Sequence, residues 1–351
     1  MDDDLGEQRP LASPSKIPIP KVRSTSDASA TSTAVKPNIN RAWVTVLTGP
    51  AYLPGTIILA DSLRRVESKY PLLVCVTPSV NKTEQNALKA AGCELMVIEP
   101  LKPKVKGNIV ASRFEDTWTK LVVFGLVPME RLVLLDSDML VIRNMDELFD
   151  MDLPFDFIAA NHACVCNYAK DPWADADWNP QNCAYTGLKH PKALTNPREV
   201  TPESIRTHHL LNSGLVVFHP STMLYAAILE FLFTDPRVPT FGFPDQDLLS
   251  VFFKNKFKPI GWQYNALKTM SYEHRDMWSD FEVRNLHFIC EKPWKTGRCE
   301  GRFKIPHGIW WDSWDRWFHE TQIKVPKLAQ FLARYVNLPG NPGSSDGSSS
   351  T

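Results

Sequence analysis

The chain has 351 residues, of which 43% are hydrophobic, and its 39 basic and 39 acidic residues cancel to no net charge at pH 7. This length and composition are enough to bury a substantial core in one large domain or two small ones. Balanced charge gives no global basic field of the kind that binds nucleic acid or an anionic membrane, so we expect neither as a partner.

Both ends of the chain are polar and poor in side chains that can pack. Residues 1–40 are rich in Pro, Ser, Thr, Lys and Asp, and residues 339–351 are rich in Gly and Ser. We expect both to be disordered tails around a single domain at residues 41–338.

We find no apolar run near the roughly 20 residues of a membrane span, and the start MDDDLGEQRP does not resemble a secretory signal. The chain has seven cysteines, an odd number, and several lie in strand-like apolar runs. This pattern favours reduced thiols in a cytoplasmic protein over a set of disulfides.

The first part of this domain alternates between strand and helix patterns. Short apolar runs predict strands at Ala42–Thr48, Leu72–Thr77 and Glu94–Ile98. One helix follows Tyr52, a second has Asn81 as its N-cap and ends at Gly92, and Thr117–Leu126 has the pattern of a third. Such βαβα alternation predicts a doubly wound α/β fold with a mostly parallel central sheet.

The segment Arg131–Asp138, RLVLLDSD, is an apolar run that ends in two aspartates. Such a run predicts a central buried strand, and ligands bind at the carboxyl ends of strands in open α/β sheets. On a regular strand Asp136 and Asp138 share a face, where two carboxylates repel each other unless a cation lies between them. Hard divalent metals take such oxygen ligands, so the segment indicates a metal–diphosphate site. An ordinary Asp-rich turn is the alternative.

The second half of the domain is less regular. It predicts strands at Phe155–Ala160, Leu215–Phe218 and Val283–Ile289 and helices at Leu224–Phe233 and Gln246–Phe253. The segment Asn161–His209 is long, irregular and rich in Trp, Asn, Pro and His, and loops of this length are usually functional. Four tryptophans within Ile309–Phe318 follow a helical spacing, which favours core packing over a sugar-binding platform.

A second candidate metal site is the group of His162, Cys164, Cys166 and Cys183. Three thiols and an imidazole could form a tetrahedral zinc site. Cys-x-Cys is not a usual zinc spacing, however, and free cysteines pack readily as small apolar side chains. The sequence leaves both alternatives open.

Six motifs follow one another along the chain. They are AWVTVLTGPAYLPG, TWTKLVVF, LLDSDMLVIRNMDELF, LNSGLVVF, FPDQDLL and HFICEKPW. Each has a structural alternative, such as a turn at Asn-Ser-Gly or a helix cap at the aspartate of FPDQ. Together, over about Ala42–Trp294, they resemble glycosyltransferase family eight, the group of glycogenin and galactinol synthase. The resemblance implies a single-domain GT-A fold, a UDP-sugar donor, a divalent metal that is usually manganese, and retention at the anomeric carbon.

The resemblance also implies roles for individual residues. The metal ligands would be Asp136, Asp138 and His287, a mixed carboxylate–imidazole set that is consistent with manganese. The donor-binding positions would be Leu47, Tyr52, Arg113, Lys120, Ser137, Gly214 and Lys292. The candidate catalytic residues, around the transferred sugar, would be Asn212, Asp245 and Gln246.

The chain departs from the glycogenin pattern at several places. Gly49-Pro50 replaces an Asn-Asp pair, Gly242 stands where glycogenin has an aspartate, and the segment from histidine to lysine is shorter by a residue. The spacing from Arg113 to Lys120 also differs. These departures leave the sugar and the diphosphate contacts open. The route to retention is open too, between a covalent intermediate on Asp245 and front-face displacement with the leaving phosphate as base.

We therefore expect a metal-dependent, retaining UDP-hexose transferase whose acceptor binds at Asn161–His209. Trp173 and Trp178 in that segment could stack on a carbohydrate or polyol acceptor, or pack onto the sheet as a lid. A protein acceptor is an alternative, because glycogenin glucosylates its own tyrosine, and Tyr168 or Tyr185 could play that part. Another alternative is a non-catalytic scaffold that binds sugar nucleotides. The sequence leaves open whether the protein is a homodimer.

Overall fold

The computed structural model describes residues 40–103, 109–110, 114–127, 129–298 and 301–338. Arg113 and, apart from Asn40, the two predicted tails lie outside the described residues. Within the described part of the chain, no helix is both long enough and apolar enough to cross a membrane.

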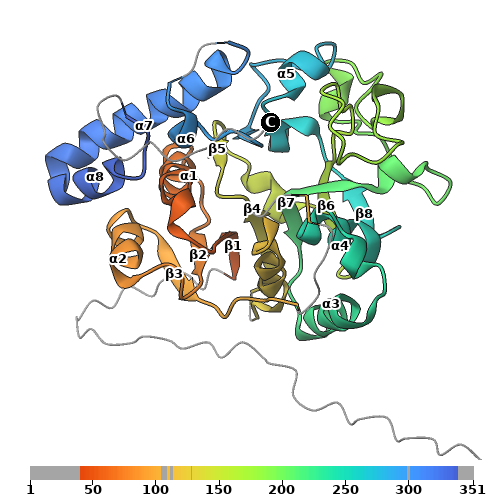
Figure 1. The fold of residues 1–351 in the computed structure, drawn as a ribbon, viewed down its shortest axis with the longest axis horizontal. Helices are drawn as coiled ribbons and strands as arrows, with labels where there is room; N and C mark the ends of the chain where they lie inside the picture. The colour runs from red at the N-terminus through yellow and green to blue at the C-terminus, as the bar shows by residue number, and fades with distance from the viewer. Residues whose placement is uncertain (1–39, 104–108, 111–113, 128, 299–300, 339–351) are drawn as a thin grey trace, which may run out of the picture.

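A seven-stranded sheet in the order β3-β2-β1-β4-β7-β6-β8 forms the centre of the molecule (Figure 1). Its strands are β1 (Arg41–Leu47), β2 (Leu72–Val76), β3 (Glu94–Val97), β4 (Arg131–Leu135), β6 (Ile158–His162), β7 (Leu211–Phe218) and β8 (Phe257–Pro259). The first four strands are parallel, as are β6 and β8, whereas β7 is antiparallel to both of its neighbours. The predicted α/β class with a mostly parallel sheet is confirmed.

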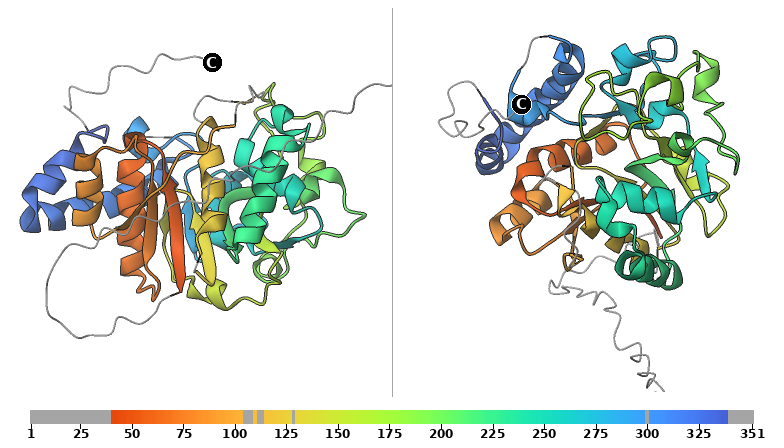
Figure 2. Two further views of the ribbon diagram at one scale, coloured as in Figure 1. Left: turned by 90° about the horizontal axis from the view of Figure 1, so that it is seen from below. Right: turned by 45° about the vertical axis from the view of Figure 1, so that its right-hand side comes forward.

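Helices cover both faces of this sheet (Figure 2). One face carries α1 (Leu53–Arg65), α2 (Lys82–Ala90), α7 (Lys304–Lys324) and α8 (Pro326–Ala333), and the other carries η3 (Thr117–Gly125), α3 (Thr222–Thr234) and α4 (Pro244–Phe252). Successive strand residues point to opposite faces. Trp43 and Val133 accordingly belong to the first of two buried apolar clusters, and Val44 and Leu134 to the second.

Local sequence signals explain where several helices begin and end. The Asn81 side chain accepts hydrogen bonds from the backbone N–H groups of Thr83 and Glu84, and the Glu84 carboxylate accepts one from the Asn81 N–H. This capping box starts α2, and Gly92, with φ of +87°, follows its end. The tryptophans of α7 are buried, so their predicted role in the core is confirmed.

A small second sheet lies beside the end of β4, in the order β5-β10-β9. Its strands are β5 (Met139–Val141), β9 (Ala266–Leu267) and β10 (Asn285–His287), with β10 antiparallel to β5 and parallel to β9. The predicted strand Val283–Ile289 is therefore shorter than expected. The remaining α-helices are α5 (Met270–Glu273) and α6 (Pro293–Thr296).

Two further expectations differ from the structure in detail. The segment Thr117–Gly125 is a 3-10 helix rather than an α-helix, which fits the low helix propensity of its β-branched threonines and valines. The irregular segment Asn161–His209 begins with the end of β6 and then holds short 3-10 turns. These are η5 (Pro180–Asn182), η6 (Lys192–Leu194) and η7 (Arg206–His209).

Candidate active site

The site begins where β4 ends. Strand β4 stops at Leu135, and the next three residues form the turn into β5, so Asp136 and Asp138 converge through a turn rather than along one strand face. The Asp136 N–H donates to the carbonyl of Gly214 on β7, at 2.8 Å. Between the two aspartates, Ser137 Oγ lies 3.2 Å from Thr45 Oγ1 on β1. The turn is therefore anchored to the strands on both sides of β4.

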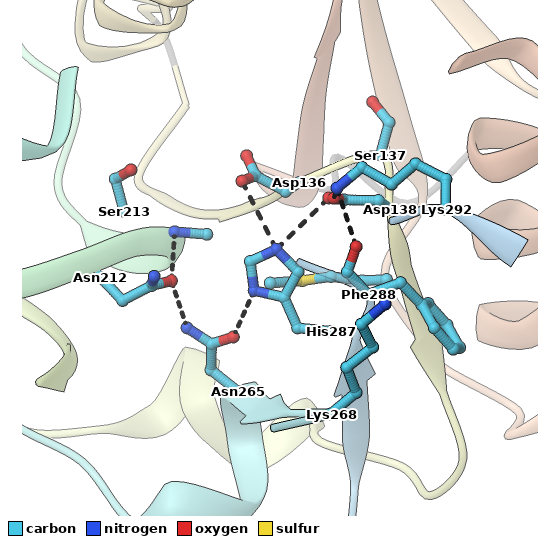
Figure 3. Close-up of polar contacts among 12 residues, drawn as sticks. Asp136, Ser137, Asp138, Asn212, Ser213, Asn265, Lys268, His287, Phe288 and Lys292 are labelled. Atoms are coloured by element: carbon cyan, nitrogen blue, oxygen red, sulfur yellow. Dashed lines mark hydrogen bonds and ion pairs between the residues drawn. The ribbon is translucent and has the colours of Figure 1, made fainter. Parts of the chain in front are cut away.

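The register of the second sheet brings His287 to this turn. His287 pairs with Met139, and the N–H of Phe288 donates to the carbonyl of Asp138 at 2.9 Å. His287 Nε2 consequently lies 3.3 Å from Asp138 Oδ1 and 3.9 Å from Asp136 Oδ2 (Figure 3). One ligand atom from each of the three residues lies within 4.8 Å of the others. The structure thus brings together all three residues that the sequence nominated as metal ligands.

A buried asparagine that no sequence motif marks orients the imidazole. Asn265 Oδ1 lies 2.9 Å from His287 Nδ1, and Asn265 Nδ2 donates to Asn212 Oδ1 at 2.8 Å (Figure 3). Asn212 Nδ2 in turn donates to Gln246 Oε1 at 3.3 Å. An oxygen opposite Nδ1 requires a proton on that nitrogen, so in the neutral imidazole Nε2 carries the lone pair and faces the two carboxylates. A cation between these groups would satisfy that arrangement.

Two lysines, the buried Lys292 and the partly buried Lys120, neutralise part of the acidic charge. Lys120 Nζ lies 2.7 Å from Asp136 Oδ1 and 3.0 Å from Asp245 Oδ2, whereas Lys292 pairs with Asp138 Oδ2. Burial raises the pKa of Asp136, and the charge of Lys120 opposes that rise. Burial acts in the same direction on Asp138, but the charge of Lys292 holds the pKa of Asp138 well below its usual range. Three carboxylates against two ammonium groups leave one net negative charge for a cation to balance.

The LNSG motif is the first part of β7 rather than a turn, and the surroundings of Gly214 explain its glycine. A Cβ atom at this position would lie 2.5 Å from Cε1 of His287 and 2.9 Å from Oδ1 of Asn212. Gly55 on α1 has a similar constraint, because its Cβ would collide with the backbone oxygen of Ser137 and with the Trp294 ring. Both glycines let the backbone approach the turn that carries the aspartates.

These residues line one cavity of about 480 Å³. All of the predicted site residues that the structure describes contribute to its walls, namely Leu47, Tyr52, Lys120, Asp136, Ser137, Asp138, Asn212, Gly214, Asp245, Gln246, His287 and Lys292. The volume is in the range of small-molecule and cofactor sites, roughly 300–1,000 Å³. The cavity can therefore hold a ligand of cofactor size against the carboxylates, the imidazole and both lysines.

An aromatic wall closes another side of the cavity. The Trp178 ring stacks on Phe243, with centroids 6.0 Å apart, and Trp173 meets both rings edge-on. Trp173 is 43% exposed, whereas Trp178 is partly buried against the core, so Trp173 is the more accessible of the two. Tyr185 is buried and its hydroxyl donates to the carbonyl of His162 at 2.8 Å. Tyr185 is therefore not accessible to a sugar donor in this structure, whereas Tyr168 is exposed.

The chain is similar in sequence to known proteins. Residues 44–297 match the family model described as glycosyl transferase family 8. Galactinol synthase 1 of Solanum lycopersicum is 31% identical over 284 residues, which are 78% of this chain and 81% of the relative. Galactinol synthase 1 of Arabidopsis thaliana is 29% identical over 311 residues, which are 84% of this chain and 87% of the relative.

Solved structures resemble the chain in fold. The galactosyltransferase LgtC, in complex with donor and acceptor sugar analogues, superposes with a TM-score of 0.52 at 16% identity and covers 78% of this chain and 94% of its own. The glycosyltransferase GlyE of Streptococcus pneumoniae TIGR4 gives a TM-score of 0.51 at 17% identity, over 78% of this chain and 60% of its own.

Proposed function

Because the chain belongs to glycosyl transferase family 8 and has the GT-A fold, we propose that it is a metal-dependent, retaining hexosyltransferase that uses a UDP-sugar. Sugar transfer follows from membership of the family. The identity of the cation, the nucleotide of the donor, the stereochemistry of transfer and the acceptor are our proposals. The observation that supports them is that two carboxylates, an imidazole and two lysines meet in one cavity. That combination fits a diphosphate bound through a divalent cation.

Asp136, Asp138 and His287 would hold the cation, and Asn265 supports this role because it fixes the proton of His287 on Nδ1. An imidazole among the ligands favours manganese over magnesium, which prefers oxygen ligands alone. When bound, the cation would offset the charge of the diphosphate.

The protein's own cations would stabilise the leaving group. Negative charge grows on the diphosphate as the sugar–phosphate bond breaks, and preorganised positive groups lower the barrier most where charge develops. Lys120 and Lys292 line the cavity and are held in place by ion pairs with aspartates, so they need little reorganisation to act. We assign the uridine end of the donor to Leu47 and Tyr52, at the carboxyl end of β1, and its diphosphate to the neighbourhood of Ser137 and Gly214.

The candidate catalytic residues are held tightly. Asp245 Oδ2 accepts a hydrogen bond from Ser213 Oγ at 2.8 Å and also pairs with Lys120. A carboxylate neutralised in this way is a poor nucleophile. We therefore favour front-face displacement, in which the acceptor hydroxyl attacks the anomeric carbon and a leaving diphosphate oxygen takes its proton. Asp245, Gln246 and Asn212 would position the sugar.

An assay with defined donors and acceptors tests the proposal. Purified protein with manganese and UDP-galactose or UDP-glucose should release UDP and form a product with the anomeric configuration of the donor, as read by NMR. The name of the galactinol synthases makes UDP-galactose and a polyol such as myo-inositol the first pair to try. A chelator should stop the reaction. An inverted product, or full activity without a divalent cation, would contradict the proposal, and mass spectrometry of the protein itself would reveal glycosylation of Tyr168.

Trp173 provides a test of where the acceptor binds. Aromatic faces stack on the apolar C–H face of sugar rings and cyclic polyols, and Trp173 presents an exposed ring to the cavity. Trp173→Ala should therefore lower kcat/KM for the acceptor about tenfold, equivalent to about 1.4 kcal/mol, and leave donor binding unchanged. Steady-state kinetics and donor titration separate the two effects.

Phe155→Ala is the matched control, because Phe155 is an exposed aromatic residue outside the cavity. Phe155→Ala should change neither kcat/KM for the acceptor nor the dissociation constant of the donor. If Trp173→Ala weakened donor binding, donor hydrolysis and thermal stability in parallel, Trp173 would be a packing residue and the acceptor would have to bind elsewhere.

A further inference from the structure

The irregular segment Asn161–His209 contains a second group of metal-binding side chains. Cys164, Cys166 and Cys183 gather around His274, which directly follows α5, and one ligand atom from each lies within 4.8 Å of all the others. The histidine suggested by the sequence, His162, is not the one that meets the three cysteines. Its Nε2 lies 2.8 Å from the carbonyl of Arg198 instead.

The spacing of the four atoms matches a tetrahedral zinc site. Zinc–sulfur bonds of about 2.3 Å and a zinc–nitrogen bond of about 2.0 Å place tetrahedral ligands about 3.8 Å apart for two sulfurs and about 3.5 Å apart for sulfur and nitrogen. The Sγ atoms of Cys164, Cys166 and Cys183 lie 3.3, 3.4 and 3.6 Å from His274 Nε2. The sulfurs of Cys164 and Cys183 are 3.9 Å apart.

Hydrogen bonding, a disulfide and apolar packing each fit this arrangement poorly. An imidazole nitrogen has one lone pair and accepts one hydrogen bond, yet three sulfurs converge on His274 Nε2. A disulfide needs sulfurs about 2.05 Å apart, far closer than those of Cys164 and Cys183. Apolar packing does not require a nitrogen at the centre of three thiols. Four converging lone-pair donors are what a bound cation needs.

We propose that Cys164, Cys166, Cys183 and His274 bind a structural zinc ion, separate from the cation site at Asp136. Thiolate ligands select zinc over manganese and magnesium, and four protein ligands leave no open position for a substrate, as in structural zinc sites. The three thiols would give their protons to solvent as the metal binds. The chemistry of the two sites therefore assigns them different metals.

The zinc would hold one wall of the active site in place. Trp173 and Trp178 lie between Cys166 and Cys183 in the sequence, and Cys164 itself lines the cavity. The segment has little regular structure of its own, and the site would tie three of its positions to the end of α5, which neighbours it in Figure 1. A chain held at these points keeps its loops ordered although little of it is helix or strand.

Metal analysis of the purified protein tests the site directly. Tag-free protein, prepared without added metal and passed through a desalting column, should contain one zinc per chain by inductively coupled plasma mass spectrometry. Cys183→Ser should lose this zinc, whereas Asp138→Asn should keep it, because Asp138 belongs to the other site. Cys75→Ser is the matched control for loss of a buried thiol, since Cys75 lies in β2 away from the cluster and should also leave the zinc in place.

A spectroscopic measurement covers the case in which Cys183→Ser does not fold. Wild-type protein made in cobalt-supplemented medium should show thiolate-to-cobalt charge-transfer absorption and the visible bands of tetrahedral cobalt. Removal of the zinc with a strong chelator should lower the melting temperature, and added zinc should restore it. Two results would overturn the proposal. One is wild-type protein with substoichiometric zinc and no thiolate–cobalt absorption, and the other is a Cys164–Cys183 disulfide detected by mass spectrometry.

Discussion

Replacing Asp138 with asparagine should abolish cation-dependent donor binding while the fold persists. The change keeps the shape of the side chain but removes the charge that faces His287 Nε2 and Lys292. Loss of a residue in the outer shell of a metal site already costs 10- to 100-fold in metal affinity, so loss of a proposed ligand should cost ~100-fold or more. Calorimetric titration of UDP in the presence and absence of manganese measures the effect.

Asp152→Asn is the control for this variant, because Asp152 is exposed and its side chain has no ion pair among the described residues. It should bind manganese and UDP like the wild type. Thermal unfolding separates lost binding from lost structure, since Asp138→Asn also leaves a buried ammonium group without its partner. If folded Asp138→Asn protein still bound UDP in a manganese-dependent way, Asp138 would not be a ligand.

The regular parts of the fold could be predicted because their signals are local. The apolar runs that predict β1, β2, β3 and β4, and the cap at Asn81, act through neighbours in the sequence. The antiparallel direction of β7 could not be predicted in this way. It depends on the path of the long segment between β6 and β7, which has no periodic pattern.

The same distinction applies to the residues of the site. Family motifs identified the residues that line the cavity, but no motif marked Asn265. Its role depends on the pairing of β9 with β10, which brings Asn265 beside His287. The cysteine cluster shows the converse case. Its three thiols stood out in the sequence, whereas the imidazole that completes it lies 91 residues beyond Cys183 and follows a short helix. His162 was chosen from the sequence because it is close to the cysteines along the chain, and that choice was wrong, since His274 is the histidine that meets them.

Replacing Lys120 with methionine should lower kcat for sugar transfer by about 10²- to 10³-fold, the usual effect of removing one preorganised group that stabilises developing charge. Methionine fills a similar volume, so the cavity keeps its shape while the ammonium between Asp136 and Asp245 is lost. The pKa of Asp136, already raised by burial, should rise further without the opposing charge. The ionised carboxylate then exists only at higher pH, so metal-dependent donor binding should disappear sooner as the pH falls.

Lys102→Met is the matched control, because Lys102 is also paired with an aspartate, Asp116, at 2.9 Å but is 64% exposed. An exposed pair of this kind contributes little, so kcat and the pH profile should stay as in the wild type. Three measurements decide the role of Lys120: kcat, the melting temperature, and the pH dependence of donor binding in the presence of manganese. A Lys120→Met enzyme that lost stability but kept its kcat per folded molecule, with an unshifted pH profile, would show that Lys120 only holds two carboxylates together.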